Sequence, residues 1–417
     1  PRLRSHDKTS PYSIMCGVFK KNKKTMISEN KKTVAVLGAT GSVGRQALDV
    51  ARRRGYRVDF IAAGKSVPET ERLCREFSVR YAALADPVAA SDLRTRLSDT
   101  DIKVLSGEDG TEEGIKLTSA GTVVNAILGE AGLRPTLATI ASGRRLALAN
   151  KESLVIAGDI VMSRVRETGV ELIPVDSEHS AIFRSLSGHT SLEVRRLILT
   201  ASGGPFFGRT REELKSVTLA ETLSHPTWKM GKKITVDSAT MMNKGFEVIE
   251  AAHLFSVPAE RIEVVVHRES ILHSAVEYID NTVIGEMSVP DMRSCVQYAV
   301  DYPDIEPGVT EELDLFRVGK MTFSPPDNEA FPLLGLAKRA YSLGGAVPAV
   351  VNAADEVAVS AFLDGKITFS DISDIVISTA EAMTYARAYT TLADIISSDR
   401  EARRIAEERV KIAEAGA

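Results

Sequence analysis

The sequence predicts an α/β protein in three parts: a doubly wound parallel sheet, a central α+β domain and a C-terminal helical bundle. A glycine-rich turn near residue 40 joins an apolar, strand-like run to a helical pattern. Apolar runs and helical patterns alternate up to about residue 175, and only helical spacing follows residue 328. The first two features are typical of a Rossmann-like domain. We expect that domain at 33–175, the central domain at 176–301, a linker at 302–327 and the helical domain at 328–417.

Composition is that of an ordinary globular protein. The chain has 417 residues, 44% of them hydrophobic and 26% charged, and a net charge of −4. These values argue against disorder and against a strong positive field for nucleic acid. The cysteines Cys16, Cys74 and Cys295 form neither a disulfide framework nor a zinc motif, and no apolar run is long enough to span a membrane. We expect a cytoplasmic protein of bacterial type with neither nucleic acid nor membrane as partner.

Residues 1–32 differ from the rest of the chain. They contain lysine pairs at positions 20, 23 and 31 and no periodic apolar pattern. They also lack the apolar stretch of a signal peptide. The segment is therefore predicted to be a flexible N-terminal extension.

The first predicted strand and helix enclose a candidate nucleotide site. The apolar run Thr33–Leu37 leads into a G-x-x-G-x-x-G turn, 38–44, and helical spacing then continues to Gly55. A strand, a glycine turn and a helix in this order allow the backbone to approach a pyrophosphate at the helix N-terminus. A tight turn without a ligand remains the alternative.

The second strand, predicted at 58–63, favours NADP over NAD. It ends at Gly64, Lys65 and Ser66, where an NAD site would have an acidic residue for the ribose hydroxyl. A lysine and a hydroxyl suit a 2′-phosphate instead. Further strands of the domain are predicted at 81–84, 104–105, 123–128 and 146–149.

A candidate metal site follows the strand predicted at 170–175. Asp176, Ser177, Glu178 and His179 come directly after it, and ligands of open α/β sheets gather at the carboxyl ends of strands. Two carboxylates there can hold a hard divalent cation. Equally, Asp176 or Ser177 can be a helix N-cap and Glu178 a favourable acid of the first turn. The tetrapeptide alone does not decide between these readings.

Two later segments add groups suited to a phosphate ester. A strand at 197–201 ends in a loop that begins with Ser202, and residues 225–247 contain the single tryptophan of the protein. A hydroxyl, an amide and an ammonium, from Ser238, Asn243 and Lys244, are the donors that a phosphate monoester needs. Glu247, one helical turn past Lys244, is a candidate third oxygen ligand.

The C-terminal region is predicted to be structural. Apolar residues keep helical spacing at 331–341 and 350–361, and the motif from Ser398 to Glu401 is predicted to be a capping box that starts the last helix. These stripes are typical of a bundle core.

Several motifs together resemble one family. They are residues 38–44, 148–155, 174–179, 202–206, 225–247, 271–278, 290–293 and 348–358. From residue 33 to about 400 the chain closely resembles 1-deoxy-D-xylulose 5-phosphate reductoisomerases, most specifically at 225–247. The resemblance implies conversion of 1-deoxy-D-xylulose 5-phosphate to 2-C-methyl-D-erythritol 4-phosphate for isoprenoid precursors. It also implies NADPH and Mg²⁺ or Mn²⁺ as cofactors, a Rossmann-like domain, a catalytic domain and a bracing helical bundle, in a homodimer.

The resemblance also assigns roles to individual residues. The metal ligands would be Asp176, Glu178 and Glu247. The NADPH contacts would be Thr40, Gly41, Ser42, Val43, Gly64, Lys65, Ser66, Asn150, Glu152 and Gly231. The substrate contacts would be Lys151, Ser177, Glu178, Ser202, His225, Ser238, Asn243, Lys244 and Glu247. Trp228 would lie in a loop that closes over the substrate, and Lys151 would stabilise oxyanion charge.

Four positions depart from the family pattern without removing a proposed ligand. Ser66 replaces a common Asn, Arg184 a usual Gln, and Arg268 with Glu269 a common Pro-Gln.

Two other functions stay open from the residues. One is a different NADP-dependent dehydrogenase acting on a small phosphorylated aldehyde, where thioester chemistry would need a nucleophilic cysteine near a base. The other is a non-catalytic NADP-binding regulator, in which loss of a metal carboxylate would be expected.

Overall fold

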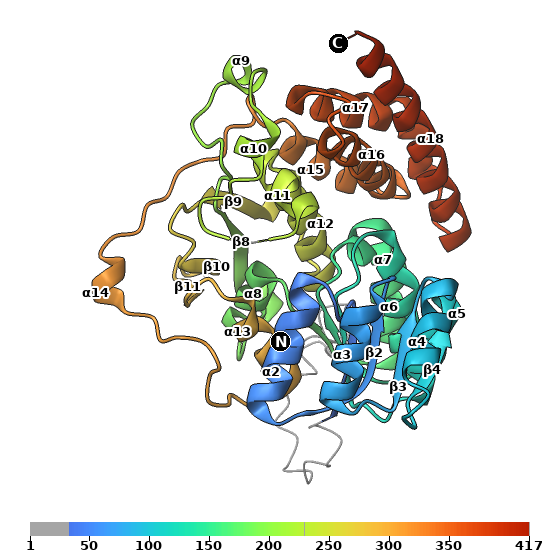
Figure 1. Cartoon of the computed structure of the whole chain (residues 1–417). Helices are drawn as coiled ribbons and strands as arrows, with labels where there is room; N and C mark the ends of the chain where they lie inside the picture. The colour runs from blue at the N-terminus through green and yellow to red at the C-terminus, as the bar shows by residue number, and fades with distance from the viewer. Residues whose placement is uncertain (1–32, 229, 417) are drawn as a thin grey trace, which may run out of the picture.

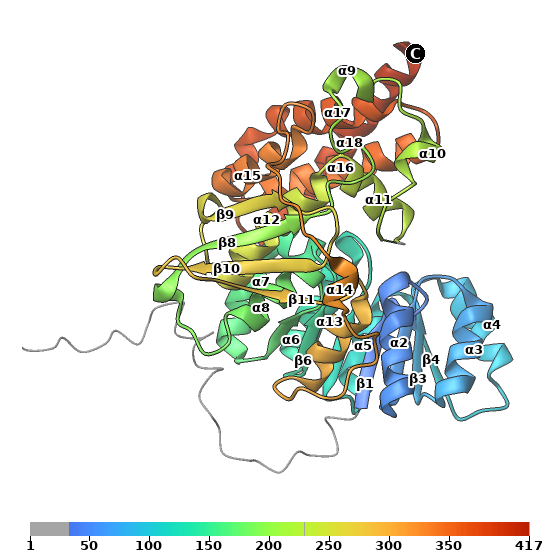
Figure 2. The same ribbon diagram turned by 90° about the vertical axis from the view of Figure 1, so that its left-hand side faces the viewer.

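The computed structural model describes residues 33–228 and 230–416, so the predicted extension at 1–32 lies outside the described part. Two sheets and a helical bundle make up the fold (Figures 1 and 2). The α/β class, the Rossmann-like first part, the second sheet and the helical C-terminal region are confirmed. The boundaries expected after residues 175, 301 and 327 stay predictions. None of the described helices is long and apolar enough to cross a membrane.

The first sheet is parallel, with strand order β4-β3-β2-β1-β5-β6-β7. Its strands are β1 (Thr33–Leu37), β2 (Arg57–Ala63), β3 (Tyr81–Leu84), β4 (Lys103–Ser106), β5 (Thr122–Asn125), β6 (Arg145–Leu148) and β7 (Leu172–Pro174). The strand expected at 123–128 is therefore shorter. The connecting helices are α2 (Ser42–Arg54), α3 (Val67–Phe77), α4 (Pro87–Arg96), α5 (Gly107–Leu117), α6 (Leu133–Ala141) and α7 (Glu152–Thr168).

The strand order reverses between β1 and β5, where ligands of such sheets bind. Gly38 follows β1 with a φ of 75°, and a Cβ there would lie 2.3 Å from the Ala126 carbonyl oxygen. A Cβ at Gly44 would lie 2.1 Å from the Gly38 carbonyl oxygen. The glycines are thus required for the tight turn that leads into α2.

The second sheet has four strands in the order β11-β10-β8-β9. They are β8 (Val194–Ala201), β9 (Ile262–Val266), β10 (Leu272–Tyr278) and β11 (Val283–Met287). Associated with them are α8 (Ser177–Ser185), α9 (Arg211–Leu214), α10 (Leu219–Thr222), α11 (Lys232–Ala239), α12 (Met242–Phe255) and α13 (Met292–Asp301). α12 is almost entirely buried, so its polar side chains lie inside the molecule.

Residues 302–332, most of them exposed, connect α13 to the bundle. This segment contains the short α14 (Leu315–Val318), and its Ser324 forms an isolated antiparallel β-bridge with Val266 at the end of β9. The bundle consists of α15 (Leu333–Leu343), α16 (Val347–Leu363), α17 (Phe369–Ala382) and α18 (Leu392–Gly416).

The capping box predicted at residues 398–401 is wrong. α18 begins at Leu392, and the Thr391 hydroxyl accepts a hydrogen bond from the Asp394 amide. Asp399 lies inside the helix and pairs with Arg403 one turn further on. The motif has the residues of a cap, but Ile395 is buried in the bundle. Because tertiary packing of apolar residues stabilises a helix more than a local cap does, α18 begins before Ile395.

Candidate active site

A cavity of about 1040 Å³ lies between the two sheets and helices α11 and α12. The residues predicted to contact the metal or the substrate line this cavity, together with Trp228 and Gly231. Those predicted contacts are Lys151, Asp176, Ser177, Glu178, Ser202, His225, Ser238, Asn243, Lys244 and Glu247. These residues come from loops after parallel strands and from two buried helices. The segments that the sequence offered separately thus meet at one place.

Three carboxylates converge in this cavity. Asp176 caps α8, Glu178 lies in the first turn of α8, and Glu247 lies on α12. One oxygen of each lies within 4.8 Å of the others. The Asp176 Oδ1 atom accepts the Ser177 amide at 3.2 Å, while its buried Oδ2 atom takes no part in this cap and lies beside the Lys151 ammonium. Asp176 is therefore an N-cap whose second oxygen remains in the carboxylate cluster.

Two buried lysines neutralise the carboxylates. The Lys151 ammonium lies 2.8 Å from Asp176 Oδ2 and 3.4 Å from Glu247 Oε1. The Lys244 ammonium lies 2.8 Å from Glu178 Oε1 and is also paired with Glu247. Although burial raises the pKa of Asp176, Lys151 lowers it to about 2. Burial and the Glu178 carboxylate instead raise the pKa of Glu247.

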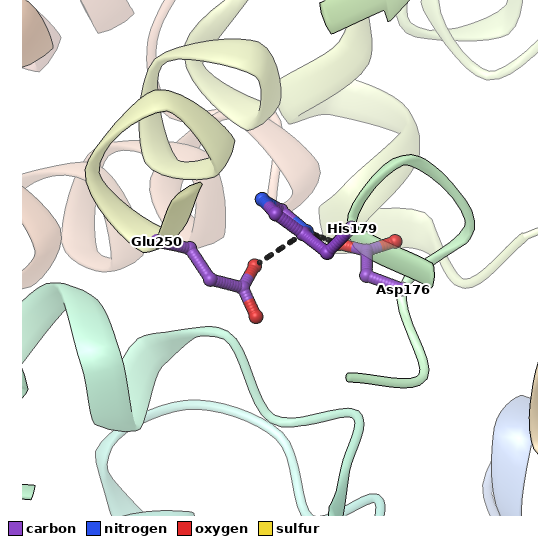
Figure 3. Close-up of side chains that lie close together, drawn as sticks. All are labelled: Asp176, His179 and Glu250. Atoms are coloured by element: carbon purple, nitrogen blue, oxygen red, sulfur yellow. Dashed lines mark ion pairs between the residues drawn. The ribbon is translucent and has the colours of Figure 1, made fainter. Parts of the chain in front are cut away.

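Behind the carboxylates lies a histidine whose role the sequence did not indicate (Figure 3). His179 is fully buried; its Nε2 atom donates to the Glu247 carbonyl oxygen at 2.9 Å, and its Nδ1 atom lies 3.2 Å from Glu250 Oε2. Burial raises the pKa of Glu250 to about 8. The available signal was the spacing of Glu250, one helical turn after Glu247. His179 thus joins α8 to α12 and fixes the two helices that bear the carboxylates relative to each other.

His225 connects two loops at the Ser202 side of the cavity. Its Nδ1 atom accepts the amides of Thr227 at 3.2 Å and Trp228 at 2.9 Å. A neutral ring then carries its proton on Nε2, which donates to the Ser202 hydroxyl at 2.9 Å. Burial, followed by the charge of Arg268, lowers the pKa of His225 to about 4. The ring therefore connects the loop of Trp228 to the Ser202 loop in its neutral form.

We expect His225 to remain neutral between about pH 5 and pH 8 in the ligand-free protein. Because its folded pKa is depressed, the free energy of unfolding should fall as pH drops from about 6.5 towards 4. NMR titration of the ring carbons, assigned with a His225→Gln variant, measures this directly. An inflection near pH 6.5 in the His225 resonance would contradict the geometry.

One departure from the family pattern has a structural role. The Arg268 guanidinium donates to the carbonyl oxygens of Gly204 at 2.8 Å and Ser202 at 3.3 Å. Arg268 thus holds the backbone of the Ser202 loop, while the Ser202 side chain lines the cavity.

The predicted cofactor residues divide into three groups. Gly41, Ser42, Val43, Glu152 and Gly231 line the cavity. Asn150 lies beneath it, where its amide donates to the carbonyl oxygens of Ile127 at 2.8 Å and Gly129 at 3.0 Å. Thr40, Gly64, Lys65 and Ser66 do not line the cavity, and the last three are exposed beyond the end of β2.

The described cysteines do not suit thioester chemistry. Cys74 and Cys295 are buried, and burial raises the pKa of Cys74 to about 12 and that of Cys295 further. Neither lines the cavity. This argues against the aldehyde dehydrogenase alternative as far as these two thiols are concerned.

Comparison with known proteins agrees with this site. The model of the 1-deoxy-D-xylulose 5-phosphate reductoisomerase family matches residues 34–158, and models of its C-terminal domains match 172–255 and 287–405. The enzyme of that name from Acetivibrio thermocellus is 50% identical over 378 residues, which are 91% of this chain and 99% of the relative. The chain belongs to the 1-deoxy-D-xylulose 5-phosphate reductoisomerase family. A second reductoisomerase, from Caldanaerobacter subterraneus, is 49% identical over 89% of this chain and 97% of its own.

Solved reductoisomerase structures share the fold. The Zymomonas mobilis enzyme in complex with NADPH is 42% identical, with a TM-score of 0.83 over 91% of this chain and 98% of that chain. A reductoisomerase in complex with NADPH, fosmidomycin and magnesium is 37% identical, with a TM-score of 0.87 over the same shares.

Proposed function

We propose that this protein converts 1-deoxy-D-xylulose 5-phosphate to 2-C-methyl-D-erythritol 4-phosphate, with NADPH and Mg²⁺ or Mn²⁺. The observation that supports it best is the convergence of Asp176, Glu178 and Glu247 beside phosphate-binding groups in one cavity. The same cavity reaches the glycine turn after β1. The groups suited to bind a metal, a phosphorylated sugar and a dinucleotide therefore lie in one cavity.

The donor set fits a hard divalent cation. Three carboxylates offer oxygen ligands within 4.8 Å of one another, and Asp176 Oδ2, which takes no part in capping α8, lies in the same cluster beside the Lys151 ammonium. The alternative trio of Asp176, His179 and Glu250 is within ligand distance too, but His179 and Glu250 do not line the cavity. We therefore assign the metal to Asp176, Glu178 and Glu247.

The chain's own residues supply binding and charge. When bound, the cation would polarise the substrate carbonyl and hydroxyl for the retro-aldol and aldol rearrangement, and NADPH would supply the hydride that reduces the rearranged aldehyde. Ser202, Ser238, Asn243 and Lys244 bind the phosphate, with His225 orienting Ser202. Lys151 stabilises developing oxyanion charge, and the Trp228 loop excludes water on closing.

The test is NADPH oxidation, followed by absorbance, with 1-deoxy-D-xylulose 5-phosphate in the presence and absence of Mg²⁺ or Mn²⁺. Metal-dependent turnover is expected, with 2-C-methyl-D-erythritol 4-phosphate as the product. Binding of NADPH without turnover would support the regulator instead.

Lys65 is proposed to select NADPH. Replacing it with glutamate should reduce the preference for NADPH over NADH by about tenfold or more, because a charge-assisted contact to the 2′-phosphate is lost. The ratio of kcat/KM for the two cofactors measures this. Lys116→Glu is the matched control, since Lys116 is an exposed lysine in the last turn of α5 and does not line the cavity. An unchanged ratio for Lys65→Glu would remove Lys65 from the cofactor site.

The working unit is proposed to be a homodimer formed through β11. This edge strand pairs only with β10 in the described chain and exposes Val283, Ile284 and Met287. Exposed apolar edge strands are sites where a second copy adds its own strand. We expect Ile284→Lys to shift the mass from light scattering to that of a monomer, while Val88→Lys on α4 leaves a dimer. The cytoplasmic location stays a prediction.

A further inference from the structure

A buried ion cluster joins the catalytic helix α11 to the bundle helix α16. The Lys233 ammonium lies 2.6 Å from Asp237 Oδ2, on its own helix, and 2.8 Å from Asp355 Oδ2, on α16. Asp355 is completely buried, and Asp237 is 3% exposed. The ammonium also lies 5.2 Å from the centre of the Phe246 ring on α12. One lysine therefore connects three helices that come from separate parts of the sequence.

The cluster has one lysine and two aspartates, so a proton on one aspartate would leave a single ion pair. Burial and the neighbouring Asp355 carboxylate raise the pKa of Asp237 well above its ordinary value, which favours the protonated form of Asp237. Lys233 then pairs with the Asp355 carboxylate across the boundary between α11 and α16. This contact, rather than the pair within α11, ties the catalytic helix to the bundle.

The position of α11 matters because both its ends contribute to the cavity. Gly231 caps its start and ends the loop of Trp228, and Ser238 lies in its last turn. Lys233, Asp237 and Ser238 all line the cavity. Lys233 and Asp237 are one turn apart and Lys233 also contacts Asp355 on α16, whereas Ser238 is turned by about 100° from Asp237. A shift of α11 relative to α16 would move the Ser238 hydroxyl directly.

Packing alone does not explain a carboxylate at position 355. α16 is apolar over most of its length, and Val350, Val351 and Ala354 already hold it in the bundle core. Burial of a charge costs free energy, and an apolar side chain would pack there at a lower cost. The carboxylate does not line the cavity, so it acts through Lys233.

We propose that Asp355 is a positioning residue of the bundle, which through Lys233 fixes α11 and so places the Ser238 hydroxyl for the phosphate of the substrate. The inference rests on the proposed function, since it concerns how the same site recognises its phosphate. It gives the C-terminal motif at 348–358 a part in substrate recognition as well as in packing.

The test uses Asp355→Ala in the full-length protein. With Asp355 gone, Lys233 keeps its pair with Asp237 within α11, so no buried charge is left alone and the variant should fold. We expect the KM for 1-deoxy-D-xylulose 5-phosphate to rise about tenfold, while kcat changes less. Asp355→Asn should restore the KM, because its amide can accept from Lys233 and donate to Asp237.

Asp371→Ala separates positioning from bundle stability. Asp371 accepts the Thr368 amide at 2.7 Å at the start of α17, so its loss weakens the bundle but not the contact with α11. If Asp355 only stabilised the bundle, both Asp355→Ala and Asp371→Ala would lower Tm and the fraction of active enzyme, and the KM would stay unchanged. That result, obtained with a parent enzyme that turns over, would overturn the inference. A parent without turnover would instead refute the proposed function.

Discussion

Glu247→Gln is expected to lower kcat/KM by about 100-fold or more and to raise the metal concentration for half-maximal rate at least about tenfold. The substitution keeps the size of the side chain but removes one of three anionic ligands from a hard cation. Glu247 is 1% exposed and lies within hydrogen-bonding distance of Lys151 and Asn243. No exposed carboxylate is close enough along α12 to replace it.

The metal-free variant should be at least as stable as the parent. Burial, then the charge of Glu178, raises the pKa of Glu247 above its ordinary value, so the unfolded state loses this proton at a lower pH than the folded state. As pH rises from about 4.5, ionisation of Glu247 therefore lowers the parent's free energy of unfolding. Glutamine does not ionise and avoids this loss. We expect an equal or higher Tm for the variant at pH 8 without metal.

Initial rates against Mn²⁺ concentration, with Tm measured in parallel, test both expectations. Glu277→Gln is the matched control: Glu277 is also buried but pairs with Arg196 on the second sheet, away from the cavity. Its rate curve should follow the parent's. Superimposable curves for Glu247→Gln and the parent would take Glu247 out of the metal site.

Lys151→Met is expected to lower kcat about 100-fold, the usual effect of removing one donor from developing oxyanion charge. Its metal dependence should differ from that of Glu247→Gln. The Lys151 ammonium competes with a cation for Asp176 Oδ2, which lies 2.8 Å away. Without it, the metal concentration for half-maximal rate should stay equal or fall.

Stability gives a second readout for Lys151. Its loss leaves three carboxylates with one lysine, so Tm without metal should fall and the rise in Tm on adding Mn²⁺ should increase. Lys338→Met is the matched control, because Lys338 is part-buried but donates only to the Ile262 carbonyl oxygen, outside the cavity. An unchanged kcat in Lys151→Met would show that another group bears the oxyanion charge.

Much of the fold and of the site could be predicted because their signals are local. Gly38 and Gly44 are needed for one tight turn, and the order of strand, turn and helix around them depends on a few adjacent residues. Helical spacing likewise put Lys244 and Glu247 on one face of a helix, as the structure shows. The resemblance of the motifs then named the family, which the comparisons confirm.

Local patterns were also the source of the error at the last helix. The motif from Ser398 to Glu401 has the residues of a cap, yet it lies inside α18. A cap stabilises a helix end by about 1 kcal/mol. Burial of an apolar helix face against the bundle outweighs it, and the length of that face is not visible in four residues.

The sequence by itself determined the types of group available: carboxylates after β7, hydroxyls and an ammonium near α12, and a lysine where an NAD site needs an acid. Only the tertiary structure decided which of them meet. Asp176 and Glu247 lie in one carboxylate cluster because α8 and α12 pack together through His179, and Lys233 reaches Asp355 because α11 lies against α16. Such pairings depend on how buried faces of distant elements fit. Side-chain periodicity records that a face is buried, and packing selects its partner.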